Sequence, residues 1–113
     1  MNTLYDRRRA TRLVPFLDSI TREILERSAA LERLEARIAE LESRSRGRAE
    51  ENDLFDLVAD AALHRRELRY AKKELDRLGC SIVGTEPLTI RIPGRQGASR
   101  RSFVWRSGDP VLR

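Results

Sequence analysis

Sixteen positions in two blocks of the chain follow alternating spacings of three and four residues, the pattern of a coiled-coil seam. Fourteen of them are apolar, whereas random placement in a chain that is 40% hydrophobic would give about six. Reflection about the bond between Gly47 and Arg48 pairs the blocks residue by residue, which predicts an antiparallel helical hairpin. The seam positions are Leu17, Ile20, Ile24, Arg27, Leu31, Leu34, Ile38, Leu41, Leu54, Leu57, Ala61, His64, Leu68, Ala71, Leu75 and Leu78.

Helix-terminating residues divide the 113 residues into expected elements. Asp6 is expected to cap a first helix, and a kink or a new helix start is expected near Val14 and Pro15, because proline lacks an amide hydrogen. Gly47 suits a left-handed turn between the long helices, and Gly79 suits the end of the second. The expected elements are a short helix over 6–13, long helices over 15–44 and 52–78, and a small β-element over 80–112, all in one domain, 1–113.

After Gly79 the hydrophobic period changes from helical to a two-residue alternation, which is typical of strands. The segments Leu88–Ile92 and Phe103–Trp105 each present apolar side chains on one face, and residues 94–101 between them are expected to form a mobile loop. We therefore predict a mainly α fold, a long antiparallel coiled-coil hairpin with a small antiparallel β-hairpin or meander at its base. The apolar face of this β-element is expected to pack on the helices near Tyr5, Leu13 and Phe16.

The net charge of +5 is concentrated at the two ends of the chain, which a hairpin brings together. Residues 1–17 carry a net +3, residues 87–113 a net +5 and residues 18–86 a net −3. Two interpretations are open: a site for a polyanion, or a coding bias, since 21 of the 23 basic residues are arginine. The candidate phosphate contacts are Arg91, Arg95, Arg100, Arg101 and Arg106.

Few residues have the character of a catalytic or metal site. His64 is the only histidine and has apolar neighbours along the seam, so no metal or other cofactor is expected. Cys80 follows a helix C-terminus, where the negative end of the helix dipole opposes thiolate formation, and we expect a packed residue. Arg27 either lays its methylenes over the seam or specifies its register. Trp105 is expected in the core, with base stacking as the alternative.

The single cysteine fits a reducing cytoplasm, and no stretch has the apolar length of an export signal or a membrane span. We expect a cytoplasmic protein that is not an enzyme and does not contact a membrane.

Short motifs at both ends resemble those of an uncharacterised bacterial family of domains of unknown function, family 2203. Tyr5-Asp6, Ala10 and Leu13-Val14-Pro15 resemble its opening motif Phe-Thr-x-x-Glu-Ala-x-x-Leu-Leu-Pro. The later matches are Leu78-Gly79, Ile92-Pro93 and the segment 104–110 (Val-Trp-Arg-Ser-Gly-Asp-Pro), which is similar to Cys-Trp-x-x-Gly-Glu-Pro. The resemblance implies a relationship and a fold but no reaction.

The departures of the chain from this family pattern include positions 9, 88 and 91. Arg9 and Arg91 stand where the pattern has acids, and Leu88 stands where it has glycine. The family also tends to continue into a Trp-His-Glu segment, so a divergent, C-terminally short member is expected.

The function expected from these features is that of a scaffold or protein-interaction module. Leu25, Phe55 and Val58 lie beside the seam, where an isolated hairpin leaves them uncovered, and a second copy or a partner helix could bury them. We therefore expect a homo-oligomer or a protein partner. The alternative is an RNA- or DNA-binding module that uses the five candidate arginines.

Overall fold

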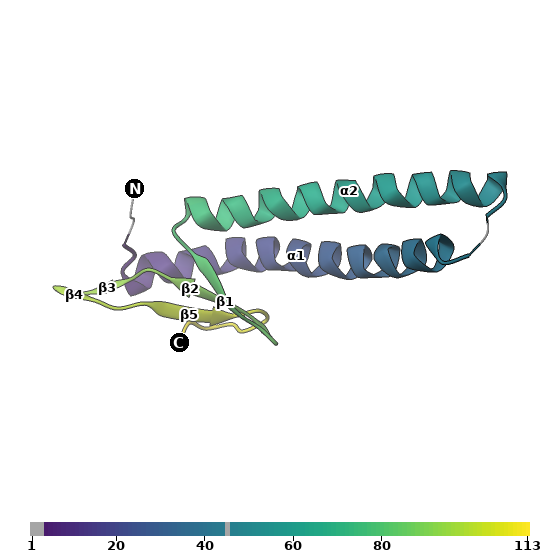
Figure 1. Cartoon of the computed structure of the whole chain (residues 1–113). Coiled ribbons are helices and arrows are strands. Elements are labelled where there is room, and N and C mark those ends of the chain that lie inside the picture. Colours follow the sequence, from purple (N-terminus) through teal and green to yellow (C-terminus); the bar gives the residue numbers. More distant parts are fainter. Residues whose placement is uncertain (1–3, 45) are drawn as a thin grey trace. The chain divides into compact units, whose positions relative to one another are not determined.

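The computed structural model describes residues 4–44 and 46–113, and within them two helices precede five short strands (Figure 1). The elements are α1 (Arg7–Glu42), α2 (Arg48–Arg77), β1 (Ser81–Thr85), β2 (Leu88–Ile92), β3 (Arg95–Gln96), β4 (Ser99–Arg100) and β5 (Phe103–Arg106).

The chain divides into two compact units, and each contains part of both helices. The base unit comprises residues 4–22 and 72–113, and the tip unit comprises residues 23–44 and 46–71. The assignment of residues 1–113 to one domain stays a prediction.

The mirrored seam forms the contact between α1 and α2, which run antiparallel (Figure 1). All sixteen seam positions are buried or half-buried. Leu17 in the base unit and Leu41 and Ala61 in the tip unit are completely inaccessible to solvent. The helical hairpin predicted from the spacing is confirmed.

Helix α1 continues through Pro15, so the predicted short helix over 6–13 and new start at residue 15 are wrong. Ala10 and Leu17, on either side of the proline, are both fully buried. Their packing stabilises a continuous helix despite the hydrogen bond that Pro15 cannot donate. The carbonyl left without this donor belongs to Thr11, which is exposed like Pro15, so solvent can hydrate it. The predicted cap is present, since the Arg9 amide donates to Asp6 Oδ1 at 2.8 Å.

Helix α2 begins at Arg48, four residues before the predicted start at 52. Gly47 does not have a left-handed φ, contrary to the prediction. Its carbonyl instead accepts the first helical hydrogen bond, from the Glu51 amide at 3.0 Å, so Gly47 is the N-cap residue.

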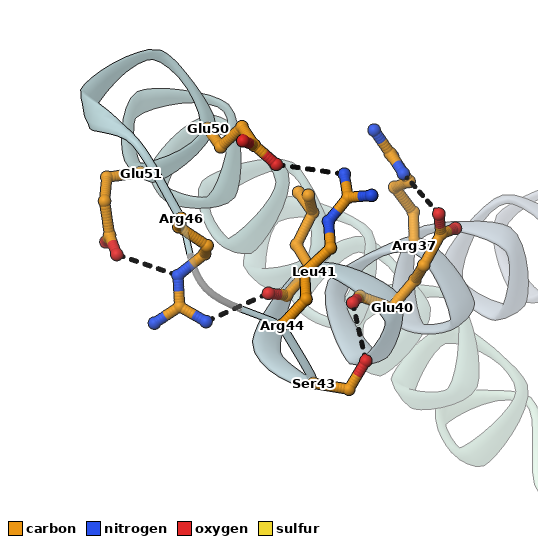
Figure 2. A network of polar contacts seen from close by, with 8 residues as sticks. All are labelled: Arg37, Glu40, Leu41, Ser43, Arg44, Arg46, Glu50 and Glu51. Carbon is orange, nitrogen blue, oxygen red and sulfur yellow. Dashed lines mark hydrogen bonds and ion pairs between the residues drawn. The ribbon is translucent and has the colours of Figure 1, made fainter.

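Two arginines between the helices connect α1 to the first turn of α2 (Figure 2). Arg44 pairs with Glu50 at 3.0 Å, and Arg46 pairs with Glu51 at 2.8 Å. Arg46 Nη1 also donates to the Leu41 carbonyl at 2.9 Å, which satisfies one of the free acceptors at the end of α1. Both acidic partners lie near the positive end of the α2 dipole, which favours their negative charge.

The predicted stop at Gly79 is confirmed by a Schellman motif. Gly79 has a φ of 76°, and its amide donates to the Asp76 carbonyl at 2.9 Å. The Cys80 amide donates to the Leu75 carbonyl at 3.0 Å, and this turn directs the chain into β1.

The predicted β-element is a three-stranded antiparallel sheet with the order β1-β2-β5. Ile90 lies opposite Trp105 and Ile92 opposite Phe103, and all four side chains are buried with Leu88 on one face. Residues of the base unit complete this core: Tyr5, Ala10, Leu17, Ile20, Leu75, Cys80 and Leu112. Of the helix contacts expected for this face, Tyr5 is buried and Leu13 half-buried, but Phe16 is 47% exposed.

The prediction that residues 94–101 form a hairpin loop too long for a tight turn is wrong, because β3 and β4 pair as a two-stranded ribbon. Gly97, with a φ of 61°, lies in the two-residue turn between these strands. At the base of the ribbon the Arg101 amide donates to the Gly94 carbonyl at 2.8 Å. A Cβ atom on Gly94 would overlap the Arg101 carbonyl oxygen and the Phe103 ring, so only glycine fits there.

We predict that Gly94→Ala lowers the free energy of unfolding by roughly 1–3 kcal/mol, because the methyl group has no space beside Phe103. Gly47→Ala is the control, since a Cβ atom there meets nothing within 4 Å. We expect the control to cost less than about 1 kcal/mol in urea unfolding. Equal losses in both variants would contradict this packing.

We also predict that Arg46→Ala lowers the free energy of unfolding by about 1 kcal/mol, because it removes both an ion pair and the Leu41 carbonyl contact. Arg44→Ala removes only an exposed ion pair and should cost about 0.5 kcal/mol or less. The same unfolding experiment measures both variants. A larger loss of stability for Arg44→Ala would show that the contact between Arg46 and the Leu41 carbonyl does not stabilise the end of α1.

Candidate functional site

The sheet register places two of the candidate phosphate contacts on the solvent face of the sheet. Arg91 lies opposite Val104 and Arg106 opposite Thr89, on the alternate positions to the buried Ile90 and Trp105. Arg95 lies opposite Arg100 in the β3–β4 ribbon, so two like charges face each other across adjacent strands.

Three of the five candidate arginines line one surface pocket in the base unit, with a volume of about 420 Å³. They are Arg91, Arg100 and Arg101, whereas Arg95 and Arg106 do not line it. The remaining lining residues are Leu4, Gly79, Pro93, Gly94 and Ser102. We call this feature the arginine pocket. The sequence gives no local signal for these remaining residues, because they come from four separate segments that only the fold brings together.

Neutral side chains hold two of the pocket arginines in place. Arg91 Nε donates to Ser102 Oγ at 2.9 Å, and Arg101 Nη1 donates to Gln96 Oε1 at 2.8 Å. Within residues 4–44 and 46–113, no carboxylate lies within ion-pair distance of Arg91, Arg100 or Arg101. The pocket therefore concentrates positive charge without an acidic partner from the described residues.

Trp105 does not extend this surface. Its side chain is 1% exposed, and its indole Nε1 donates to the Asp109 carbonyl at 2.9 Å. The expected core position is confirmed, and the alternative of stacking on a base is wrong because the ring is covered.

The other candidate site, the apolar residues beside the seam, is exposed in the tip unit. Phe55 is 76% exposed, Val58 47% and Leu25 45%. Arg65 Nη2 lies 3.3 Å from Glu35 Oε2, an ion pair that joins α2 to α1 on one side of the seam. Residues three or four positions apart lie on the same side of a helix. Such steps lead from Arg65 to Val58 and Phe55 on α2, and from Glu35 to Leu25 on α1. All three apolar residues therefore lie on the side of the seam where this ion pair lies.

The two polar seam residues contact each other. Arg27 Nη1 lies 3.3 Å from His64 Nδ1, and Arg27 Nε lies 3.7 Å from Glu23 Oε1. This geometry requires a neutral His64 tautomer that accepts at Nδ1. The sequence placed both residues on the seam but not against each other, because the mirror relation pairs Arg27 with Leu68.

Cys80 is a packed residue, 2% exposed, and burial raises the pKa of its thiol to about 11. Burial, and not the helix dipole expected from the sequence, is therefore the cause of the weak acidity of this thiol. Among the described residues, no three His, Cys, Asp or Glu side chains lie close enough together to hold a metal ion. No helix in the described parts of the chain combines the length and apolar character needed to cross a bilayer.

A protein-family model described as "Uncharacterized conserved protein (DUF2203)" matches residues 3–113. The chain belongs to this family. The resemblance inferred from the terminal motifs is therefore confirmed. No curated protein and no solved structure matches the chain.

The residues that carry the family resemblance hold the base unit together. Tyr5 Oη donates to the Leu78 carbonyl at 2.9 Å, and the Tyr5 amide donates to the Pro93 carbonyl at 2.9 Å. The Trp105 bond to Asp109 joins two further motif residues. In this member of the family, these motif positions act by connecting the N-terminal segment, the end of α2 and the sheet.

We predict that the folded state loses stability as the pH rises from about 9 to 11. The Cys80 thiol has a pKa of about 11 when buried, against an ordinary value of 9.0, so the unfolded chain ionises first and its free energy falls relative to that of the folded state. The contribution is constant below pH 9 and declines by an amount of order 2 kcal/mol towards pH 11. The pKa of Tyr5 is also raised, chiefly by burial, and acts in the same direction.

Urea unfolding at several pH values, compared between the wild type and Cys80→Ala, isolates this effect. The variant should show a shallower decline above pH 9. If the unfolding free energies of the two proteins changed with pH in parallel, the thiol would ionise equally well in the folded and unfolded states, which would contradict the prediction.

Proposed function

We propose that this protein is a non-enzymatic interaction module that self-associates through the tip unit. The proposal rests on the exposure of Phe55 at 76% and of Val58 at 47%, both beside the buried seam of α2. Burial of a large apolar side chain is worth about 1.5–3 kcal/mol, so association has a driving force here.

The charges that surround these residues favour a second copy as the occupant. We call the surface formed by Leu25, Phe55, Val58 and their charged neighbours the interaction face. On this face α1 contributes the acids Glu32 and Glu35, and α2 contributes the bases Arg65 and Arg69. All four side chains are exposed. A face with one acidic and one basic helix is complementary to itself.

The charge pattern also selects one of two symmetric arrangements. A two-fold axis parallel to the helices places α1 of one copy on α2 of the other, so that Glu32 and Glu35 face Arg65 and Arg69. A two-fold axis that crosses the helices places α1 on α1 and α2 on α2, which opposes like charges. We therefore propose a dimer in which both hairpins point the same way and Phe55 and Val58 pack on α1 of the partner.

We predict that the double variant Phe55→Glu/Val58→Glu is monomeric at concentrations of roughly tens of micromolar, where the wild type is dimeric. Sedimentation equilibrium measures the mass of both. Leu63→Glu is the matched control, because Leu63 is 41% exposed on the other flank of α2 and should leave the dimer intact.

A second pair of variants tests the charge pattern. Arg65→Glu/Arg69→Glu and Glu32→Arg/Glu35→Arg should each be monomeric alone, and a mixture of the two should form a heterodimer. A monomeric wild type, or dissociation by Leu63→Glu as readily as by the Phe55 and Val58 changes, would overturn the proposal.

A further inference from the structure

We propose that the arginine pocket binds the phosphate group of a small phosphorylated ligand. Three arginines, Arg91, Arg100 and Arg101, line a single concave site of about 420 Å³. That volume lies within the range of small-molecule sites. A site with several positive charges favours a multiply charged phosphate over a single carboxylate.

The hydrogen bonds of the arginines leave donors free for such a ligand. Arg91 uses Nε on Ser102 Oγ, which leaves its two terminal nitrogens for a phosphate oxygen. Arg101 uses Nη1 on Gln96 Oε1, which leaves Nη2 and Nε. Both partners are neutral, so they orient the guanidinium groups without cancelling their charge. Ordered arginine forks of this kind recognise phosphate by paired, charge-assisted hydrogen bonds.

The fold also gives the pocket a rigid wall. Gly94 and Pro93 line it, and Gly94 is fixed by its hydrogen bond from the Arg101 amide and by the Phe103 ring against it. The Tyr5 carbonyl accepts from the Arg95 amide at 2.8 Å and so holds the chain beside Leu4, another lining residue. The backbone at Arg91 and Arg101 is therefore held by hydrogen bonds to neighbouring segments.

A small ligand fits these observations better than a nucleic-acid strand. Strand-binding surfaces commonly stack bases on exposed aromatic rings, and the Trp105 ring in this sheet is covered. The two remaining candidate arginines, Arg95 and Arg106, do not line the pocket, so they are not needed for a single phosphate group.

Isothermal titration calorimetry with inorganic pyrophosphate at physiological salt tests the proposal. We expect saturable binding at one site per chain and a rise in Tm with pyrophosphate concentration, because the ligand binds only the folded state. Arg91→Gln and Arg101→Gln should each weaken binding by about ten-fold or more. Arg95→Gln is the matched control. It also removes one positive charge, from strand β3 outside the pocket, and should change the affinity by less than about three-fold.

A short single-stranded oligouridylate forms the second arm of the experiment and identifies the source of the phosphate. Competition between the oligonucleotide and pyrophosphate, with the same dependence on Arg91 and Arg101, would place a backbone phosphate in the pocket and support the site. Binding of the oligonucleotide but not of pyrophosphate, weakened equally by Arg91→Gln, Arg95→Gln and Arg106→Gln, would overturn the proposal. It would show that positive charge spread over the surface binds the strand. Absence of pyrophosphate binding to the folded wild type would also overturn it.

Discussion

Burial of the mirrored seam between α1 and α2 is the interaction on which the other features depend. Charged residues make up 36% of the chain, and its long helices are marginal in isolation unless an apolar face is covered. The seam is narrow, with alternating spacings of three and four residues, so each helix covers the stripe of the other and little else. Side chains beside the stripe, including Phe55 and Val58, therefore remain in solvent. The proposed interaction face follows from the narrow width of the seam.

The alternation of side chains along the strands has a similar consequence in the base unit. Leu88, Ile90 and Ile92 bury one face of β2, and this places Arg91 on the other. Tyr5 then joins the N-terminal segment both to the end of α2 and to the sheet through its hydroxyl and its backbone. The arginine pocket lies where these segments meet. The packing of one face of β2 into the core thus leaves Arg91 on the opposite face, where it lines the proposed binding site.

The parts of the fold that depend on local pattern could be predicted from the sequence. The seam, the Asp6 cap, the Gly79 stop and the buried faces of β2 and β5 each leave a periodic or capping signal within a few residues. The continuity of α1 through Pro15 could not be predicted, because packing of Ala10 and Leu17 decides it and their partners lie far away in the sequence. The pocket could be predicted only in part: five arginines were candidates, but the selection of three depends on the β3–β4 ribbon and on Leu4, Gly79 and Gly94.

Disulfide formation between seam positions tests whether one chain pairs its own two helices in the mirrored register. Cysteines at Ile38 and Leu57, introduced with Cys80→Ala, are mirror partners and should form a disulfide within one chain under mild oxidation. Cysteines at Ala39 and Asp56 lie on opposite flanks of the seam and provide the control, which should not crosslink within a chain. Non-reducing denaturing electrophoresis should show a compact monomer for the first pair. Disulfides that form only between chains at Ile38 and Leu57 would contradict the hairpin and indicate exchange of helices between copies.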